Sequence, residues 1–245
     1  MASDHQLHHR SVGETQTGKV RADNQDAILV DEAAGLWIVA DGMGGHEGGA
    51  EASRLAIATV REAVRAGQSL RQAILTAHGA ISARQSAAPE LSAMGTTIVA
   101  VLDREGQYEI NWVGDSRAYL FDRGQASLER LTRDHNIAGL LVEAGRITDS
   151  EADRHPKRHV LTDCLGIRTQ EAPKIDQYRG RWQPGQLLLL CSDGLSGELS
   201  QGSIARVLSE ETSIDDAAGR LMREALQAGA RDNVSVILIE SPAVT

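Results

Sequence analysis

The sequence is poor in aromatic and basic residues, and this scarcity excludes one class of partner. Aromatic residues make up 3% of the 245 residues, and the formal net charge is −9. A nucleic-acid surface needs stacking rings and basic patches, so we expect no nucleic-acid partner. Hydrophobic residues still make up 41% of the chain. That is enough for one sizeable core, and we expect a single domain over residues 1–245.

Cysteines and long apolar segments are also scarce. There are two cysteines, Cys164 and Cys191, and Cys191 ends the apolar run 187–191, which indicates a buried thiol rather than a disulfide. No segment approaches the ~20 apolar residues of a membrane span, and the N-terminus lacks the apolar core of a signal peptide. We therefore expect a cytoplasmic monomer that does not bind membranes, with a flexible terminus over residues 1–10.

Short apolar runs, several rich in β-branched residues, predict buried strands. They lie at 27–30, 36–40, 97–102, 109–113, 117–121, 187–191 and 234–239. Short turns at 104–106 and 114–116 join three consecutive strands. This spacing favours antiparallel pairing over a doubly wound parallel sheet.

Amphipathic helices are expected between these strands. Apolar residues recur with helical spacing over 51–66, 70–81 and 214–226. Ser69 with Gln72 has the spacing of a capping box, and Gly229 suits the position just past a helix end. Helices that alternate with the strands in this way suit sheets covered by helices. Residues 134–166 break into helical fragments around a basic stretch at 154–159, so we expect a surface excursion there.

Four aspartates lie at the ends of the apolar strands. They are Asp41, Asp115, Asp193 and Asp232. An Asp-Gly pair at a strand end is by itself typical of a turn. Four carboxylates beside buried strands carry a desolvation cost unless each is paired or binds a cation. Because the sequence has no equal set of neighbouring basic residues, the conjunction indicates bound metal.

The ligand types indicate which metal. No Cys or His cluster has zinc spacing, whereas aspartate and carbonyl oxygens suit Mg²⁺ or Mn²⁺. Glycines follow Asp41 at positions 42, 44 and 45, so the backbone can turn and offer the Gly42 carbonyl beside the carboxylate. One carboxylate can bridge two ions roughly 3.5–4 Å apart, which would activate water and stabilise an in-line displacement at phosphorus.

An anionic substrate also needs a permanent cation. Arg21 precedes the first predicted strand, and its guanidinium can bind two phosphate oxygens at once. The alternative is an exposed arginine paired with Asp23 or Asp26.

Seven short motifs occur in order along nearly the whole chain. They are Arg21-x-x-Asn24-Gln25-Asp26, Asp41-Gly42-Met43-Gly44-Gly45-His46, Gly95-Thr96-Thr97, Gly114-Asp115-Ser116-Arg117, Asp134-His135, Ser192-Asp193-Gly194 and Asp232-Asn233-Val234-Ser235. One such motif is weak evidence, but seven in register are specific. Together they resemble the metal-dependent protein phosphatase family, the type 2C serine/threonine phosphatases, in its compact bacterial form.

The resemblance implies an α+β fold, a four-layer α-β-β-α sandwich of two antiparallel sheets flanked by helices. It also implies hydrolysis of phosphoserine and phosphothreonine in proteins by a metal-activated water, opposing a bacterial serine/threonine kinase. Residues 134–166 would be the flap that shapes substrate access. The resemblance implies that Asp41 bridges two Mg²⁺ or Mn²⁺ ions, that the Gly42 carbonyl completes the site of one ion, and that Asp193 and Asp232 hold the other. Asp115 with Asp193 would take part in a third ion site. Arg21 would bind the phosphoryl group, and Asp26 would hold metal-bound water from behind the metals.

Two positions, Met43 and Asp163, depart from the family pattern, and the role of His46 is open. Met43 stands where larger eukaryotic relatives have a histidine proposed as general acid, and it cannot donate a proton. His46 is either a proton donor or a structural or substrate-side residue of a Gly-rich turn. Asp163 replaces an arginine that is common after the flap, which leaves its effect on the third ion site open.

Two other functions fit parts of the sequence. A silent phosphoprotein-binding module would have lost a metal aspartate or Arg21, and this chain keeps them all. A nuclease or small-molecule phosphatase is disfavoured by the acidic composition and by the absence of a nucleophilic Asp-x-Asp motif.

Overall fold

Two antiparallel sheets form the centre of the molecule. The computed structural model describes residues 9–44, 48–91, 93–166 and 172–241. One sheet has the strand order β1-β11-β10-β7-β8, and the other has the order β2-β3-β5-β6-β9, with β4 paired to β3. The bounds are β1 Arg10–Gln16, β2 Asp26–Asp31, β3 Leu36–Met43, β4 Gly95–Thr96, β5 Ile98–Arg104, β6 Gln107–Val113, β7 Arg117–Asp122, β8 Ser127–Arg130, β9 Asp176–Arg181, β10 Gln186–Cys191 and β11 Val234–Glu240.

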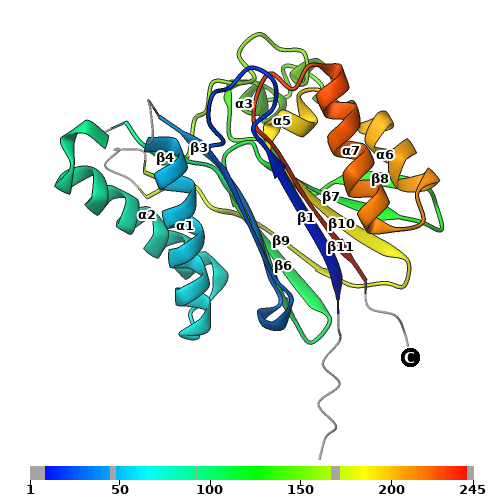
Figure 1. Cartoon of the computed structure of the whole chain (residues 1–245), viewed down its shortest axis with the longest axis horizontal. Coiled ribbons are helices and arrows are strands. Elements are labelled where there is room, and N and C mark those ends of the chain that lie inside the picture. The colour runs from blue at the N-terminus through cyan, green and yellow to red at the C-terminus, as the bar shows by residue number, and fades with distance from the viewer. Residues whose placement is uncertain (1–8, 45–47, 92, 167–171, 242–245) are drawn as a thin grey trace, which may run out of the picture.

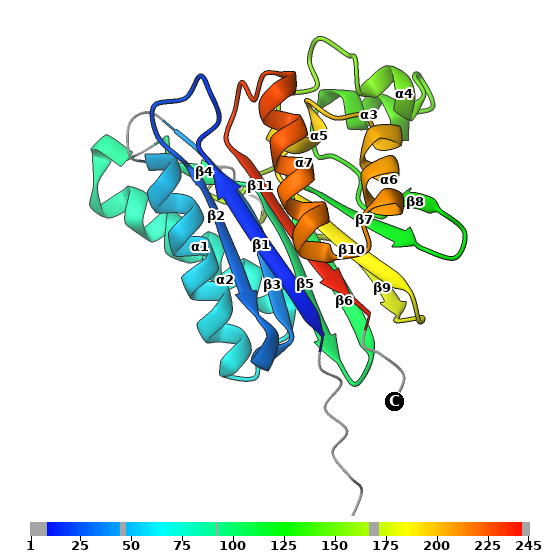
Figure 2. The same ribbon diagram turned by 45° about the vertical axis from the view of Figure 1, so that its right-hand side comes forward.

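Helices cover both outer faces of the sheets, so the layers run α-β-β-α as expected (Figure 1). Figure 2 shows α6 and α7 over the first sheet and α1 and α2 on the other side of the molecule. The bounds are α1 Gly48–Arg65, α2 Leu70–Ala87, α3 Ile137–Glu143, α4 Asp149–Ala152, α5 Asp193–Ser196, α6 Gln201–Glu210 and α7 Ile214–Ala228, with 3-10 helices η1 Glu32–Ala34 and η2 Pro89–Leu91.

Alternation along the central strands fills three buried layers. On β3, Leu36, Ile38 and Ala40 pack against α1 and α2, while Trp37 and Val39 face the other sheet. β10 and β11 do the same, because alternate residues of a strand point to opposite faces. A strand with two buried faces reads as a continuous apolar run. All seven predicted strands are confirmed by the observed strand bounds.

The local helix signals were also correct. Ser69 Oγ accepts a hydrogen bond from Gln72 N–H at 3.3 Å at the start of α2. Gly229 lies directly after α7, with φ of 142°. Cys164 and Cys191 are buried thiols, and burial raises the pKa of Cys191 to about 12. No helix in the described ranges is long and apolar enough to cross a membrane.

The expectation of a flexible terminus over residues 1–10 is wrong for its last two residues. Residues 1–8 lie outside the described residues, but His9 is buried and Arg10 opens β1. Arg10 pairs with Glu240, at the end of the sandwich where β11 ends. At the opposite end, Gln16 pairs with Val234, and the chain leaves β1 into a loop that returns as β2. That opposite end holds the candidate site.

Candidate active site

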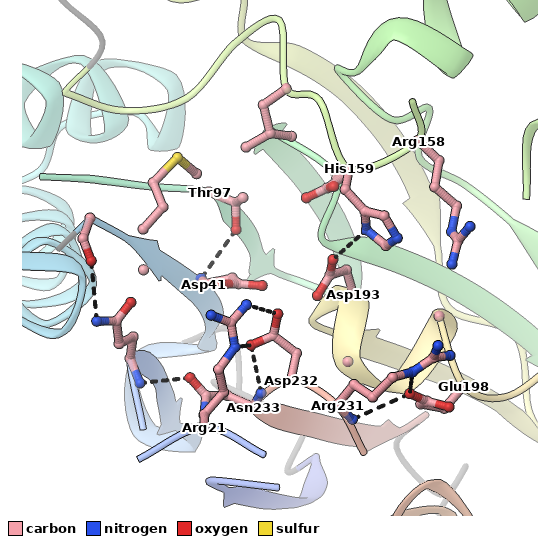
Figure 3. Close-up of a pocket in the computed structure, with 18 of the residues that line it drawn as sticks. Arg21, Asp41, Thr97, Arg158, His159, Asp193, Glu198, Arg231, Asp232 and Asn233 are labelled. Carbon is pink, nitrogen blue, oxygen red and sulfur yellow. Dashed lines mark hydrogen bonds and ion pairs between the residues drawn. The ribbon is translucent and has the colours of Figure 1, made fainter. Parts of the chain in front are cut away.

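A cleft of about 1040 Å³ opens at that end of the sandwich (Figure 3). Its wall combines the loop before β2, the end of β3, the turn between β6 and β7, the start of α5, the approach to β11, and the flap. The lining residues are Arg21, Ala22, Asp23, Gln25, Asp41, Gly42, Met43, Gly44, Thr97, Asp115, Arg158, His159, Val160, Leu161, Asp193, Gly194, Gly197, Glu198, Arg231, Asp232 and Asn233. Every predicted site residue except Asp26 lines this cleft.

Asp41 ends the buried part of β3, and two threonines hold its backbone. Thr97 Oγ1 accepts from Asp41 N–H at 3.1 Å, and Thr97 N–H donates to Asp41 O at 2.8 Å. Thr96 Oγ1 also donates to Asp41 O, at 2.9 Å. The Gly95-Thr96-Thr97 motif therefore fixes the direction in which the Asp41 carboxylate enters the cleft.

Two glycines of the motifs allow close backbone approaches around the acids. A Cβ at Gly42 would lie 2.1 Å from Gly49 O, and one at Gly194 would lie 1.9 Å from Asn233 O. No side chain fits at either distance. Gly194 thus brings the start of α5, with Asp193, against the approach to β11, with Asp232.

Asp26 joins the two sheets behind the cleft. Its Oδ2 accepts from Ser192 Oγ at 2.8 Å and from Ser235 Oγ at 2.6 Å. These serines belong to the motifs that carry Asp193 and Asp232, and Asp26 itself pairs across the strands with Asp41. The side chain is 8% exposed, and its Oδ1 has no hydrogen-bond partner among the described residues.

The clustered carboxylates raise one another's pKa values. Burial raises the pKa of Asp41 well above its usual range, and the charges of Asp26, Asp193, Asp115 and Asp232 raise it further. Burial and Asp193 do the same to Asp115. Burial raises the pKa of Asp26 to about 6, although its two serine hydrogen bonds oppose that shift. The folded chain therefore disfavours these negative charges unless a cation compensates them.

Arg21 supplies part of that compensation. Its Nε donates to Asp232 Oδ1 at 2.9 Å and its Nη2 donates to Oδ2 at 2.6 Å, which raises the pKa of Arg21. The paired carboxylate is thus Asp232, not Asp23 or Asp26. Asn233 holds the loop in place: its Oδ1 accepts from Gln25 N–H at 2.8 Å, and its Nδ2 donates to Asp23 O at 2.9 Å.

The carboxylates are suitable ligands for divalent cations, but in this structure they do not form a complete coordination site. Within the described ranges, no three His, Cys, Asp or Glu side chains are already arranged to hold an ion. Arg21 occupies the Asp232 carboxylate in this arrangement. A bound cation would nevertheless compensate the carboxylate charges that raise one another's pKa values. A water bound to that cation could donate a hydrogen bond to the buried, unpartnered Asp26 Oδ1.

The motif around Asp134 is structural. Arg117 forms a two-point ion pair with Asp134, with Nε to Oδ1 at 3.0 Å and Nη2 to Oδ2 at 2.7 Å. His135 N–H donates to Gly114 O at 2.9 Å, and His135 Nδ1 accepts from Gly114 N–H at 3.3 Å. The start of the flap is therefore bound to the turn that presents Asp115.

Several cleft residues were not identified as site residues from the sequence. His159 Nδ1 lies 3.4 Å from Asp193 Oδ2, Arg158 lines the cleft beside it, and Arg231 Nε donates to Glu198 Oε1 at 3.0 Å. For Arg158 and His159 the available signal was the basic stretch 154–159. Of the two departures from the family pattern, Met43 lines the cleft. Asp163 is absent from the described lining and accepts from Lys174 N–H at 3.2 Å, and His46 lies outside the described residues.

The two packed sheets with an acid-rich cleft at one end suit a hydrolase that acts on an anionic substrate, and the comparisons identify the family. Residues 15–233 match the family described as protein phosphatase 2C. The chain therefore belongs to the protein phosphatase 2C family of serine/threonine protein phosphatases. The resemblance read from the motifs is confirmed.

Two sequence relatives and one solved structure show how similar this chain is to known phosphatases. The serine/threonine protein phosphatase PstP of Mycobacterium tuberculosis is 35% identical over 237 residues, which is 94% of this chain and 45% of PstP. The chain thus spans about half the length of that relative. The serine/threonine phosphatase stp of Listeria welshimeri is 31% identical over 239 residues, covering 92% of this chain and 93% of stp. The structure of the PstP catalytic domain with 2 manganese ions has a TM-score of 0.82 at 32% identity, covering 96% of this chain and 99% of that one.

Proposed function

We propose that this chain is a single phosphatase domain that hydrolyses phosphoserine and phosphothreonine in proteins. The observation that carries the proposal is the acid cluster of the cleft, where Asp115, Asp193 and Asp232 lie around Asp41, with the buried Asp26 behind it and Arg21 paired with Asp232. We further propose that the enzyme acts as a cytoplasmic monomer and opposes a bacterial serine/threonine kinase.

Asp41, the Gly42 carbonyl, Asp193 and Asp232 would hold two divalent ions, and Asp115 with Asp193 would contribute to a third site. The manganese complex of the similar PstP domain supports this choice of metal; Mg²⁺ has the same ligand preference. When bound, such ions supply the Lewis acidity that generates a nucleophile from water near neutral pH.

Arg21 would orient the phosphoryl group. Two of the five N–H donors of its guanidinium are on Asp232, so three remain for phosphoryl oxygens. Asp232 thereby holds Arg21 in place. A fixed, permanently charged fork reduces the motion lost when the phosphate binds.

Asp26 would orient water from behind the cleft. Its Oδ2 is fixed by Ser192 and Ser235, so the unpartnered Oδ1 is the atom left to accept a hydrogen bond. The donors from Ser192 and Ser235 also fix the distance between the two sheets at this point. Asp26 is therefore a positioning residue rather than an expected metal ligand.

A substrate panel tests the proposed specificity. Phosphothreonine and phosphoserine peptides, nucleoside monophosphates and single-stranded DNA would be compared in the presence of Mn²⁺ and of Mg²⁺. We expect kcat/KM for the peptides to exceed that for the other substrates by at least about tenfold, because the open cleft has room to contact peptide residues that flank the phosphorylated side chain. Faster turnover of nucleotides or cleavage of DNA would contradict the proposal and support another metallohydrolase.

A further inference from the structure

The acidic residues of the flap are already engaged. Asp149 is paired with Arg130, and Asp153 Oδ1 accepts from Arg117 Nη2 at 2.9 Å. Glu151 caps its own helix, α4. Two of the three flap carboxylates around α4 thus bind arginines that belong to the first sheet. They are not used to neutralise the flap's own basic residues.

Three basic residues of the flap segment that follows α4 have no such partner. Arg154, Lys157 and Arg158, here called the basic flap strip, have no carboxylate within ion-pair distance in the described part of the chain. Arg154 and Lys157 are exposed, and Arg158 is half-buried. The protein has a net charge of −9, so the positive charge of this strip differs in sign from the protein as a whole. An unpaired positive patch attracts anionic partners.

Arg158 connects the strip to the active-site cleft. It lines the cleft beside His159, which reaches Asp193 (Figure 3). The other arginines of the lining are bound to carboxylates: Arg21 to Asp232 and Arg231 to Glu198. Arg158 is therefore the lining arginine that keeps its charge unpaired among the described residues.

We propose that the basic flap strip binds an anionic group of the substrate that lies a few residues from the phosphorylated side chain. The inference rests on the proposed phosphatase function and adds a sequence preference to it. The group is a carboxylate or a second phosphate, since both match the guanidinium geometry of Arg158 and the point charge of Lys157. Val160, exposed and also in the lining, adds an apolar contact next to the strip.

Matched phosphothreonine peptides test the preference. The four peptides differ at the two positions that lie two residues before and two residues after the phosphothreonine. Both positions carry alanine in the first peptide, aspartate in the second, lysine in the third, and a non-hydrolysable phosphonate analogue of phosphoserine in the fourth. With Mn²⁺ at low salt we expect kcat/KM for the aspartate peptide to exceed that for the alanine peptide about three- to tenfold, and the lysine peptide to be the slowest. The ratio falls as salt is added. A higher rate for the phosphonate than for aspartate assigns the strip to multiply phosphorylated segments.

Variants locate the preference on the strip. Arg158→Gln, and more fully the combined Arg154→Gln, Lys157→Gln and Arg158→Gln, should bring the aspartate-to-alanine ratio towards one, while Arg158→Lys retains most of it. Arg181→Gln is the matched control, because Arg181 is an exposed arginine at the far end of β9 and lies outside the cleft lining. It should leave the ratio unchanged. Thermal unfolding checks that each variant folds.

Two kinds of failure are distinguishable. Equal turnover of all four peptides, or a ratio that the combined variant does not change, would overturn the strip's role and leave the phosphatase function intact. No turnover of any peptide with Mn²⁺ or Mg²⁺ would overturn the phosphatase function, and the inference with it.

Discussion

Asp193→Asn should lower kcat/KM for a phosphothreonine peptide by a factor of about 10² to 10³. The amide keeps the shape of the side chain but loses the charge and the anionic oxygen offered to a cation. Losing several kcal/mol of transition-state charge stabilisation corresponds to a loss of that size. Steady-state phosphate release with Mn²⁺ present is the measurement.

The same variant should not lose its fold. Asp193 raises the pKa values of Asp41, Asp115 and Asp26 by its charge, so removing that charge relieves repulsion. In excess chelator we expect the free energy of unfolding of Asp193→Asn to equal or exceed that of the wild type. Added Mn²⁺ should raise the unfolding midpoint of the wild type more than that of the variant, because binding to the native state stabilises it.

Asp216→Asn serves as the control for charge removal. Asp216 is exposed in the first turn of α7, outside the cleft lining. Its loss should leave kcat/KM within about twofold of the wild type. Equal losses in both variants would mean that Asp193 acts through overall charge and not through the cleft.

Gly194→Ala should damage stability and activity together. The new Cβ would lie 1.9 Å from Asn233 O, a backbone atom, so either α5 or the approach to β11 must move. Overpacking of this kind costs about 1–3 kcal/mol and occasionally more. Because the contact sets the spacing of Asp193 and Asp232, we also expect kcat/KM to fall by about tenfold or more. Urea unfolding and phosphate release measure the two effects.

Gly79→Ala is the matched glycine control. Gly79 is exposed in α2, and a Cβ there meets no atom within 4 Å. Alanine is the better helix former, so this variant should gain about 0.5–1 kcal/mol with unchanged kcat/KM. Wild-type stability and activity in Gly194→Ala would contradict the claim that the close approach at Gly194 sets the spacing between Asp193 and Asp232.

The central strands of the fold were predictable from sequence, and three of the edge strands were not. Strands with two buried faces, such as β10 and β11, are apolar along most of their length. β1, β8 and β9 lie at sheet edges, where one side faces solvent, and they carry charged or polar residues instead. Their pairing depends on neighbours that are distant in the chain. Helix α6 was missed because it buries only Ile204, Val207 and Leu208.

The candidate site was predictable where residue type and strand end coincide. Asp41, Asp193 and Asp232 each follow or precede an apolar run, Arg21 was proposed as the permanent cation for an anionic substrate, and the family motifs supplied Asp26. Pairings across the fold were not predictable, because nothing local brings Arg21 to Asp232 or His159 to Asp193. The same applies to Arg158, which enters the cleft through the flap. Its basic neighbours were visible in the sequence, but their lack of acidic partners was visible only in the structure.

Hydrolysis with and without divalent metal tests the central claim most directly. The wild-type chain would be treated with excess chelator, assayed on a phosphothreonine peptide, and assayed again after Mn²⁺ or Mg²⁺ is restored. The proposed acid cluster predicts that kcat/KM falls by at least about 10³ on chelation and returns with either metal. Turnover that persists unchanged in excess chelator would contradict the account.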